Sequence, residues 1–186
     1  MKKFELTTEF ITNAFGKKLF RIKALVEFGD VKAGELGGYV EKEGNVSQAD
    51  NAWVSGDARV YGDARVSGNA RVYGNARVRG DARVSGDARV SGNAWVSGNA
   101  RVYGDARVYG DADYALVQGF GTEFRCTTFY RGKNKKIMVN CGCFHGDLEG
   151  FRKQVKETRN GKIAKEYLMI ADLMEYHFTS EDSSNE

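Results

Sequence analysis

The residue types best suited to metal chemistry lie near the C-terminus, where a histidine follows three cysteines: Cys126, Cys141, Cys143 and His145. Cys141, Cys143 and His145 alternate, so they share one face of an extended strand, and Cys126 lies nearly opposite Cys141 if the chain folds back about Asn134. Thiolate and imidazole ligands of this kind could hold Zn²⁺. Zinc knuckles usually place two cysteines in a C-x₂-C turn, however, and small cysteines pack well inside hairpins. We therefore expect packing and no cofactor, with a zinc site at these residues as the alternative.

Arginine recurs every six residues between about Asp50 and Ala112, which offers a second kind of chemistry, the binding of phosphate. If residues eighteen apart stack on one another, the arginines form outward columns, one of which consists of Arg65, Arg83 and Arg101. Asp63 and Asp81 run beside this column, and such neighbours offset the repulsion between stacked like charges. Because exposed ion pairs contribute little, the favoured interpretation is a solvated, self-compensated charge lattice. A phosphate-binding stripe is the alternative.

Large aromatic side chains also occupy outward positions of the repeat, where such side chains are normally sparse. They are Trp53, Tyr61, Tyr73, Trp95, Tyr103 and Tyr109. Cover by the terminal segments or by sister subunits is the simpler interpretation, and a surface for a foreign partner is the alternative. Together with the arginine column, these aromatic residues make up the predicted binding site.

All of these positions belong to an uninterrupted six-residue repeat with the consensus G-[DN]-A-R-V-[SY], which runs from Gly56 to Gly110. Side chains alternate between the two faces of an extended chain, so an even repeat keeps Ala and Val on one face and Arg on the other. Gly followed by Asp or Asn is typical of a turn. Each hexad therefore predicts one flat side and one corner. Three sides make a triangular coil of eighteen residues, stacked about 4.8 Å from the next coil.

The motif V-[SY]-G-[DN]-A-R resembles the hexapeptide repeat of left-handed parallel β-helix proteins. The resemblance implies a mainly β fold with triangular, left-handed coils, and it favours a homotrimer. The segment from Gly29 to Glu43 looks like uncharacterised hexapeptide-repeat proteins of tailed bacteriophages and prophages. The N-C-G-C-F motif at residues 140–144 is similar to a small module attached to several phage repeat proteins. Both resemblances imply a phage setting.

The segments that flank the repeat predict a cap and a small module. Two alternating segments around residues 13–16 predict a β-hairpin that closes the open end of the coil. After the repeat, residues 123–130 and 136–141 predict a second hairpin, and apolar residues at helical spacing follow Asp147, a possible N-cap. We therefore expect an N-terminal β-hairpin cap at residues 1–32, a parallel β-helix at 33–115, a ββαα module at 116–178 and a disordered tail at 179–186.

Composition excludes several classes of partner. The formal net charge of +3 is too small to predict a nucleic-acid-binding protein or an acidic mimic of DNA. The chain shows no signal peptide and no apolar run of the length that spans a membrane, so we expect a cytoplasmic protein.

The leading hypothesis for function is a non-catalytic, phage-encoded interaction scaffold that binds a host protein or a small signalling nucleotide and so counters host defence. The alternative is a hexapeptide-repeat acyltransferase with an acyl-coenzyme A donor, an activity common among proteins of this resemblance. That enzyme needs a catalytic histidine near the coils and usually a loop at one corner, whereas the repeat has no histidine and no insertion. We therefore lean away from an enzyme.

Overall fold

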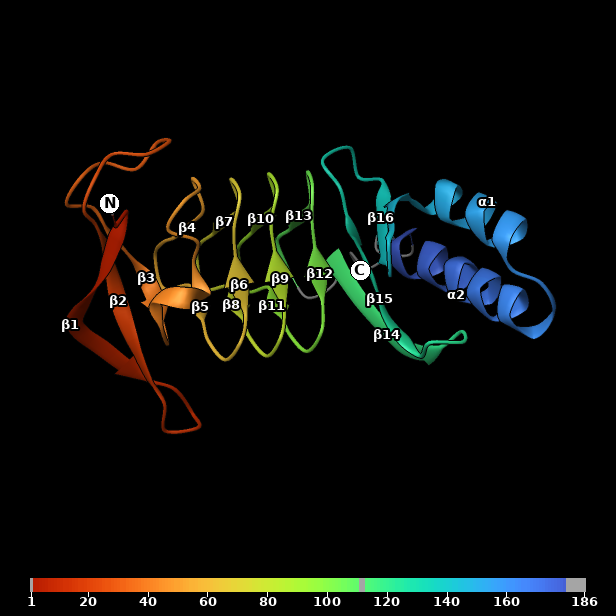
Figure 1. The fold of residues 1–186 in the computed structure, drawn as a ribbon, viewed down its shortest axis with the longest axis horizontal. Coiled ribbons are helices and arrows are strands. Elements are labelled where there is room, and N and C mark those ends of the chain that lie inside the picture. The colour runs from red at the N-terminus through yellow and green to blue at the C-terminus, as the bar shows by residue number, and fades with distance from the viewer. Residues whose placement is uncertain (1, 111–112, 180–186) are drawn as a thin grey trace, which may run out of the picture. The chain divides into compact units, whose positions relative to one another are not determined.

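The structure is a computed structural model that describes residues 2–110 and 113–179. The chain divides into two compact units, residues 1–111 and 112–186, and each unit is described by itself (Figure 1). The first unit contains the repeat, and the second contains the C-terminal sheet and helices. The fold is mainly β, with a parallel β-solenoid, N-terminal strands and a C-terminal module with two helices, as the sequence predicts.

The first unit begins with the predicted hairpin, formed by β1 (Phe4–Thr12) and β2 (Lys18–Ala24). Asn13 closes its turn, because the side-chain Oδ1 accepts hydrogen bonds from the backbone N–H groups of Phe15 and Lys17 at 2.9 and 3.0 Å. Strand β3 (Leu36–Val40) pairs antiparallel with β2 and parallel with β5 of the repeat. The hairpin therefore continues one side of the coil as a sheet.

Each full hexad of the repeat forms a two-residue strand, in which Arg or Trp is followed by Val. The strands are β4 (Trp53–Val54), β5 (Arg59–Val60), β6 (Arg65–Val66), β7 (Arg71–Val72), β8 (Arg77–Val78), β9 (Arg83–Val84), β10 (Arg89–Val90), β11 (Trp95–Val96), β12 (Arg101–Val102) and β13 (Arg107–Val108). They stack in the orders β3-β5-β8-β11, β4-β7-β10-β13 and β6-β9-β12, one stack for each side of the coil. Arg71 pairs with Arg89, and Arg65 pairs with Arg83, so the predicted stacking of residues eighteen apart is confirmed. The left-handed sense of the coil stays a prediction from the resemblance.

The interior of the coil is filled by the Ala and Val side chains of the repeat, which are fully buried from Ala52 to Val108. Glycine stands at the corners with φ between 61° and 72° from Gly56 to Gly104, in the left-handed region that other residues rarely adopt. Close stacking adds a second constraint, because a Cβ on Gly86 would lie 2.8 Å from the backbone nitrogen of Gly104. The corner glycines are therefore required by both the turn and the next coil.

A buried amide satisfies the backbone at the first coil. Asn45 ends the short 3₁₀ turn η1 (Glu43–Asn45), and its Nδ2 donates to the carbonyl oxygens of Gly62 and Ala64 at 3.1 and 2.9 Å. A side chain thus supplies the donors that a preceding coil would otherwise supply. This contact agrees with the expectation that the N-terminal segment must close the open end of the stack.

The second unit is an antiparallel sheet followed by two helices. The elements are β14 (Tyr114–Phe120), β15 (Arg125–Arg131), β16 (Ile137–Cys141), β17 (Phe144–Asp147), α1 (Leu148–Thr158) and α2 (Gly161–Thr179). The strands pair in chain order. The hairpin of β15 and β16 and both helices were predicted, whereas β14 and β17 were not. Strand β14 was missed because its first residues follow the repeat without a break, and β17 was missed because it spans only four residues.

The core of the second unit lies between the sheet and the helices. Phe129 and Val139 of the sheet are fully buried against Phe151 of α1 and Met174 of α2. Asp147 is the predicted N-cap of α1, since its Oδ1 accepts a hydrogen bond from the backbone N–H of Gly150 at 2.9 Å. The predicted disordered tail began at Thr179, but this residue ends α2, and residues 180–186 lie outside the described residues.

Candidate ligand-binding groove

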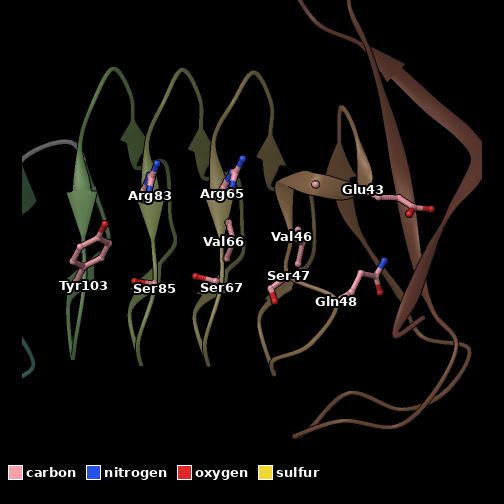
Figure 2. A pocket seen from close by; sticks show the side chains of 11 residues that line it. Glu43, Val46, Ser47, Gln48, Arg65, Val66, Ser67, Arg83, Ser85 and Tyr103 are labelled. Atoms are coloured by element: carbon pink, nitrogen blue, oxygen red, sulfur yellow. The ribbon is translucent and has the colours of Figure 1, made fainter. Parts of the chain in front are cut away.

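A groove of about 650 Å³ opens on the side of the coil formed by β6, β9 and β12 (Figure 2). One end is formed by residues 43–48, which contain η1 and the segment after it. The rest is lined by residues 65–67 and by Arg83, Ser85 and Tyr103 from the following coils. The groove therefore runs along the axis of the stack rather than across it.

The alternation of the extended chain explains which side chains reach this groove. Val66 points into the coil and is fully buried, so its neighbours Arg65 and Ser67 both point outward. The next coil repeats this arrangement with Arg83 and Ser85, because Arg65 pairs with Arg83. Figure 2 shows the result as two rows, with the arginines in one row and the hydroxyl-bearing side chains in the other, ending at Tyr103.

The groove has a surplus of positive charge. Arg65 and Arg83 are exposed, and among the described residues no carboxylate lies within 4.0 Å of either guanidinium. Asp63, the predicted neighbour of Arg65, instead binds the ammonium of Lys42 at 2.7 Å, and this hydrogen bond is the main reason why the pKa of Asp63 is lowered. Asp63 therefore still interacts electrostatically with Arg65, as expected, but its close ion pair is formed with Lys42.

The corner side chains of another side also bond along the axis rather than to arginine. Asn51 donates from Nδ2 to Oδ1 of Asn69 at 3.0 Å, and Asn69 donates in the same way to Oδ1 of Asp87 at 3.0 Å. Asn and Asp can replace one another in such a ladder because an amide can donate to either oxygen. The alternation of Asn and Asp in the consensus is thus explained by stacking. The arginines of this side have other partners, since Arg71 binds Asp30 and Arg107 donates to the backbone carbonyl oxygen of Asp87 at 3.0 Å.

Two of the predicted binding aromatics are covered by the N-terminal segment. Trp53 is 2% exposed, and its ring makes edge contacts with Phe4 and Phe28, with centroids 6.2 and 5.4 Å apart. Tyr61 is 9% exposed in a cluster with Leu19. No partner can reach these rings in this structure, so the interpretation as cover by a terminal segment applies to both.

The remaining predicted aromatics lie on different parts of the coil. Trp95 is 39% exposed on β11, where the Arg79 guanidinium lies 4.7 Å from the ring centroid. Tyr109 is exposed, and Tyr73 is half-buried. Of the aromatic residues predicted as binding residues, Tyr103 is the one that lines the groove. Arg101 stacks on Arg83 as the third member of the predicted column.

The four predicted zinc ligands do not converge. A two-residue turn that contains Cys143 separates β16 from β17, so Cys141 pairs with Phe144 and the expected alternation through His145 is broken. In the register of β15 and β16, Thr127 is the partner of Cys141, which directs the preceding Cys126 to the other face of the sheet.

Other groups occupy the positions around these side chains. The Sγ of Cys141 accepts a hydrogen bond from Oγ1 of Thr127 at 3.2 Å, whereas Nε2 of His145 lies 3.1 Å from Oη of Tyr130. Within residues 2–110 and 113–179, no group of three or more His, Cys, Asp and Glu side chains could hold a metal ion. The described residues therefore do not bring the four side chains together, and the zinc site given as the alternative stays a prediction.

Sequence reasoning found the arginines and Tyr103 but missed the serines that face them. Ser67 and Ser85 occupy the sixth position of the hexad, two residues after the arginine, so they lie on the same outward face of the strand. The alternation alone could therefore have placed these serines beside the arginines. Ser47 and Glu43 could not be found in this way, because they precede the repeat and reach the groove only through the fold.

The stacked sides and the closed interior define a parallel β-solenoid protein. Within that class, the repeat is similar to the family described as YdcK Beta solenoid repeat, whose model matches residues 52–68, 58–71, 64–80, 82–98 and 100–112. The matches cover the repeat and leave the N-terminal strands and the C-terminal module outside. A comparison with curated proteins gives no significant match. None of the helices in the described part of the chain has the length and apolar character needed to cross a membrane.

Proposed function

We propose that the chain is a non-catalytic binding scaffold of the cytoplasm and that its groove takes up a small, phosphate-bearing nucleotide. The observation that carries this proposal is the pair of exposed guanidinium groups of Arg65 and Arg83, stacked one coil apart beside serine hydroxyls and Tyr103. Guanidinium groups match phosphate oxygens in geometry and charge, and a tyrosine ring offers a flat surface on which a base can stack.

Electrostatics favour an anion at this position. Neighbouring strands of a stack lie about 4.8 Å apart, so the two arginines repel each other when the groove is empty. A phosphate between them interacts favourably with both and removes that repulsion. The serines Ser67 and Ser85 provide hydroxyl groups that donate to phosphate or ribose oxygens.

Calorimetric titration of the full chain tests the proposal. The probes are ADP, cyclic di-AMP and inorganic phosphate, which separate a nucleotide from a bare anion. We expect a nucleotide to bind and the double variant R65Q/R83Q to bind it at least tenfold more weakly, because a hydrogen bond to a charged group contributes about 1.5–3 kcal/mol.

Arg89→Gln is the matched control, since Arg89 is an exposed arginine at the same position of the hexad on another side of the coil. Its affinity should stay within about twofold of the wild-type value. Absence of binding to every probe, or equal affinity of the wild type and R65Q/R83Q, would remove the proposal. If inorganic phosphate binds as tightly as the nucleotides do, the groove is an anion site without preference for nucleotides, and the nucleotide part of the proposal is wrong.

The resemblance to phage repeat proteins supports a phage-encoded role in which the scaffold sequesters a signalling nucleotide of the host. A host protein as partner and a homotrimer stay predictions. The alternative function, acyl transfer from acyl-coenzyme A, has no observation in its favour: the two histidines of the chain, His145 and His177, belong to the second unit and not to the coil.

A further inference from the structure

A small cavity opens in the second unit where the turn between β16 and β17 meets the two helices. Its volume is about 80 Å³. Pockets for drug-sized ligands measure roughly 300–1,000 Å³, so this cavity suits a ligand of only a few non-hydrogen atoms. Phe144, Phe151 and Tyr167 line it with their rings. The ring centroids of Phe144 and Phe151 are 5.5 Å apart and those of Phe151 and Tyr167 are 5.8 Å apart, so the rings form one continuous apolar wall.

Two arginines bring positive charge to the cavity. The Arg125 guanidinium lies across the turn, since a Cβ on Gly142 would lie 2.7 Å from its Nη1. The ion pair of Arg125 with Glu123 is long, at 3.9 Å, and exposed, so it contributes little. Arg159 follows α1 and donates from Nη1 to the carbonyl oxygen of Thr158 at 3.1 Å, although a guanidinium carries five N–H donors. Both arginines therefore keep donors for a ligand.

The cavity has one positive charge in excess. Among the described residues that line it, Arg125 and Arg159 are cationic and Glu123 is anionic. Both guanidinium groups also act on the hydroxyl of Tyr167. Burial raises the pKa of Tyr167 and the nearby Cys141 thiol adds to the rise, whereas Arg159 and Arg125 oppose it. A tyrosine with a raised pKa is protonated at neutral pH, so this hydroxyl is a hydrogen-bond donor beside the two cations.

We propose that this cavity binds a small aliphatic monocarboxylate, whose carboxylate group lies between Arg125 and Arg159 and whose hydrocarbon end packs against the aromatic wall. Guanidinium groups bind carboxylates through paired N–H donors, and the hydroxyl of Tyr167 adds another donor. One excess positive charge matches a monoanion better than a phosphate dianion, and the apolar wall favours a ligand with a hydrocarbon part. The site is independent of the groove, because every residue that lines it belongs to the second unit.

Titration of the ¹⁵N-labelled full chain with butyrate, followed by NMR at the backbone amide of Gly142, tests the proposal. We expect a saturable shift with a dissociation constant of roughly 1–20 mM, as suits a ligand of about six non-hydrogen atoms. Butyramide, which is similar in size but uncharged, and inorganic phosphate should each bind at least about fivefold more weakly. The double variant R125Q/R159Q should lose at least about fivefold in affinity for butyrate, because both charged donors are removed.

K153Q/K162Q is the matched control, since it also removes two positive charges, from exposed lysines of α1 and α2 that do not line the cavity. Its affinity for butyrate, like that of R65Q/R83Q, should stay within about twofold of the wild-type value. The proposal is overturned if the Gly142 amide does not shift up to about 100 mM butyrate, or if R125Q/R159Q binds like the wild type. Equal binding of butyramide or phosphate overturns the carboxylate as ligand, and loss of binding in R65Q/R83Q overturns the location.

The exposed thiol of Cys143, which also lines the cavity, gives a second readout at the site itself. Iodoacetate is a small carboxylate, and its reaction with the thiolate forms an S–C bond at Cys143 and expels iodide. Iodoacetamide reacts in the same way but is uncharged, so the thiolate fraction cancels in the ratio of the two rates. Peptide mass spectrometry should show that the ratio of the iodoacetate rate to the iodoacetamide rate at Cys143 falls at least about threefold in R125Q/R159Q and not in K153Q/K162Q. An unchanged ratio in R125Q/R159Q overturns the role of the two arginines.

Discussion

A buried lysine in the first unit donates hydrogen bonds to backbone carbonyl groups at the start of the solenoid. Lys3 is buried, and its ammonium donates to the carbonyl oxygens of Asp50 and Ala52 at 2.5 and 2.8 Å and lies 4.6 Å from the ring centroid of Phe28. Burial lowers the pKa of Lys3 from 10.5 to about 8, although the nearby Asp50 carboxylate opposes the shift. The pKa falls because burial disfavours the charged ammonium relative to the neutral amine.

The lowered pKa of Lys3 predicts how stability depends on pH. Between pH 8 and 10.5 the folded state has already released the proton that the unfolded state still binds, so this residue makes the free energy of unfolding rise with pH. Lys3→Met removes the titration together with both hydrogen bonds. Urea denaturation at about pH 7 and about pH 10 should show the wild type gaining stability relative to Lys3→Met as the pH rises. A difference that is the same at both values would contradict the lowered pKa.

At the scale of the elements, the period of six predicts the sides of the coil because every strand obeys the same alternation. The prediction succeeded where local rules act alone: Val66 inward, Arg65 outward, glycine at the corners. The period could not name contacts that depend on distant residues. Cover of Trp53 by a terminal segment was the favoured interpretation, but its partners Phe4 and Phe28, like the end of the groove at residues 43–48, come from segments outside the repeat. A turn of two residues after Cys141 was enough to disperse the predicted zinc ligands.

Glycine is needed at the corners of the coil for two reasons, the positive φ of the turn and the close approach of the next coil, and substitutions can test them separately. Gly98→Ala meets only the strain of φ +63°, since nothing lies within 4 Å of the added Cβ, and it should cost about 1 kcal/mol. Gly86→Ala adds a contact of 2.8 Å with the backbone of Gly104 to a φ of +72°, and it should cost about 2–4 kcal/mol. Denaturation in urea gives both values.

Gly44→Ala completes this series, because Gly44 has an ordinary φ and open space around its Cα. Its free energy of unfolding should change by less than about 0.5 kcal/mol. Equal costs at Gly86 and Gly98 would show that the coils relax apart at the corners and that stacking places no separate demand on glycine there.

For the molecule as a whole, the proposed binding groove is complete within the first unit. Every residue that lines it lies between Glu43 and Tyr103, so the second unit supplies none of its lining.

The solenoid should tolerate the loss of a complete coil, because each coil contacts only its neighbours along the axis. Deletion of residues 75–92 joins Gly74 to Asn93 and restores the hexad, so that Arg65 stacks on Arg101 and Ser67 lies beside Tyr103. We expect a folded chain with the same β-type circular dichroism per residue, a lower melting temperature and a groove that still binds the nucleotide within about tenfold of the wild-type affinity. Deletion of residues 75–77 removes fewer residues but an odd number, which exchanges the inward and outward positions of the chain that follows. It should lower the melting temperature further than the longer deletion does, and the opposite order in thermal denaturation would contradict the alternation on which the coil depends.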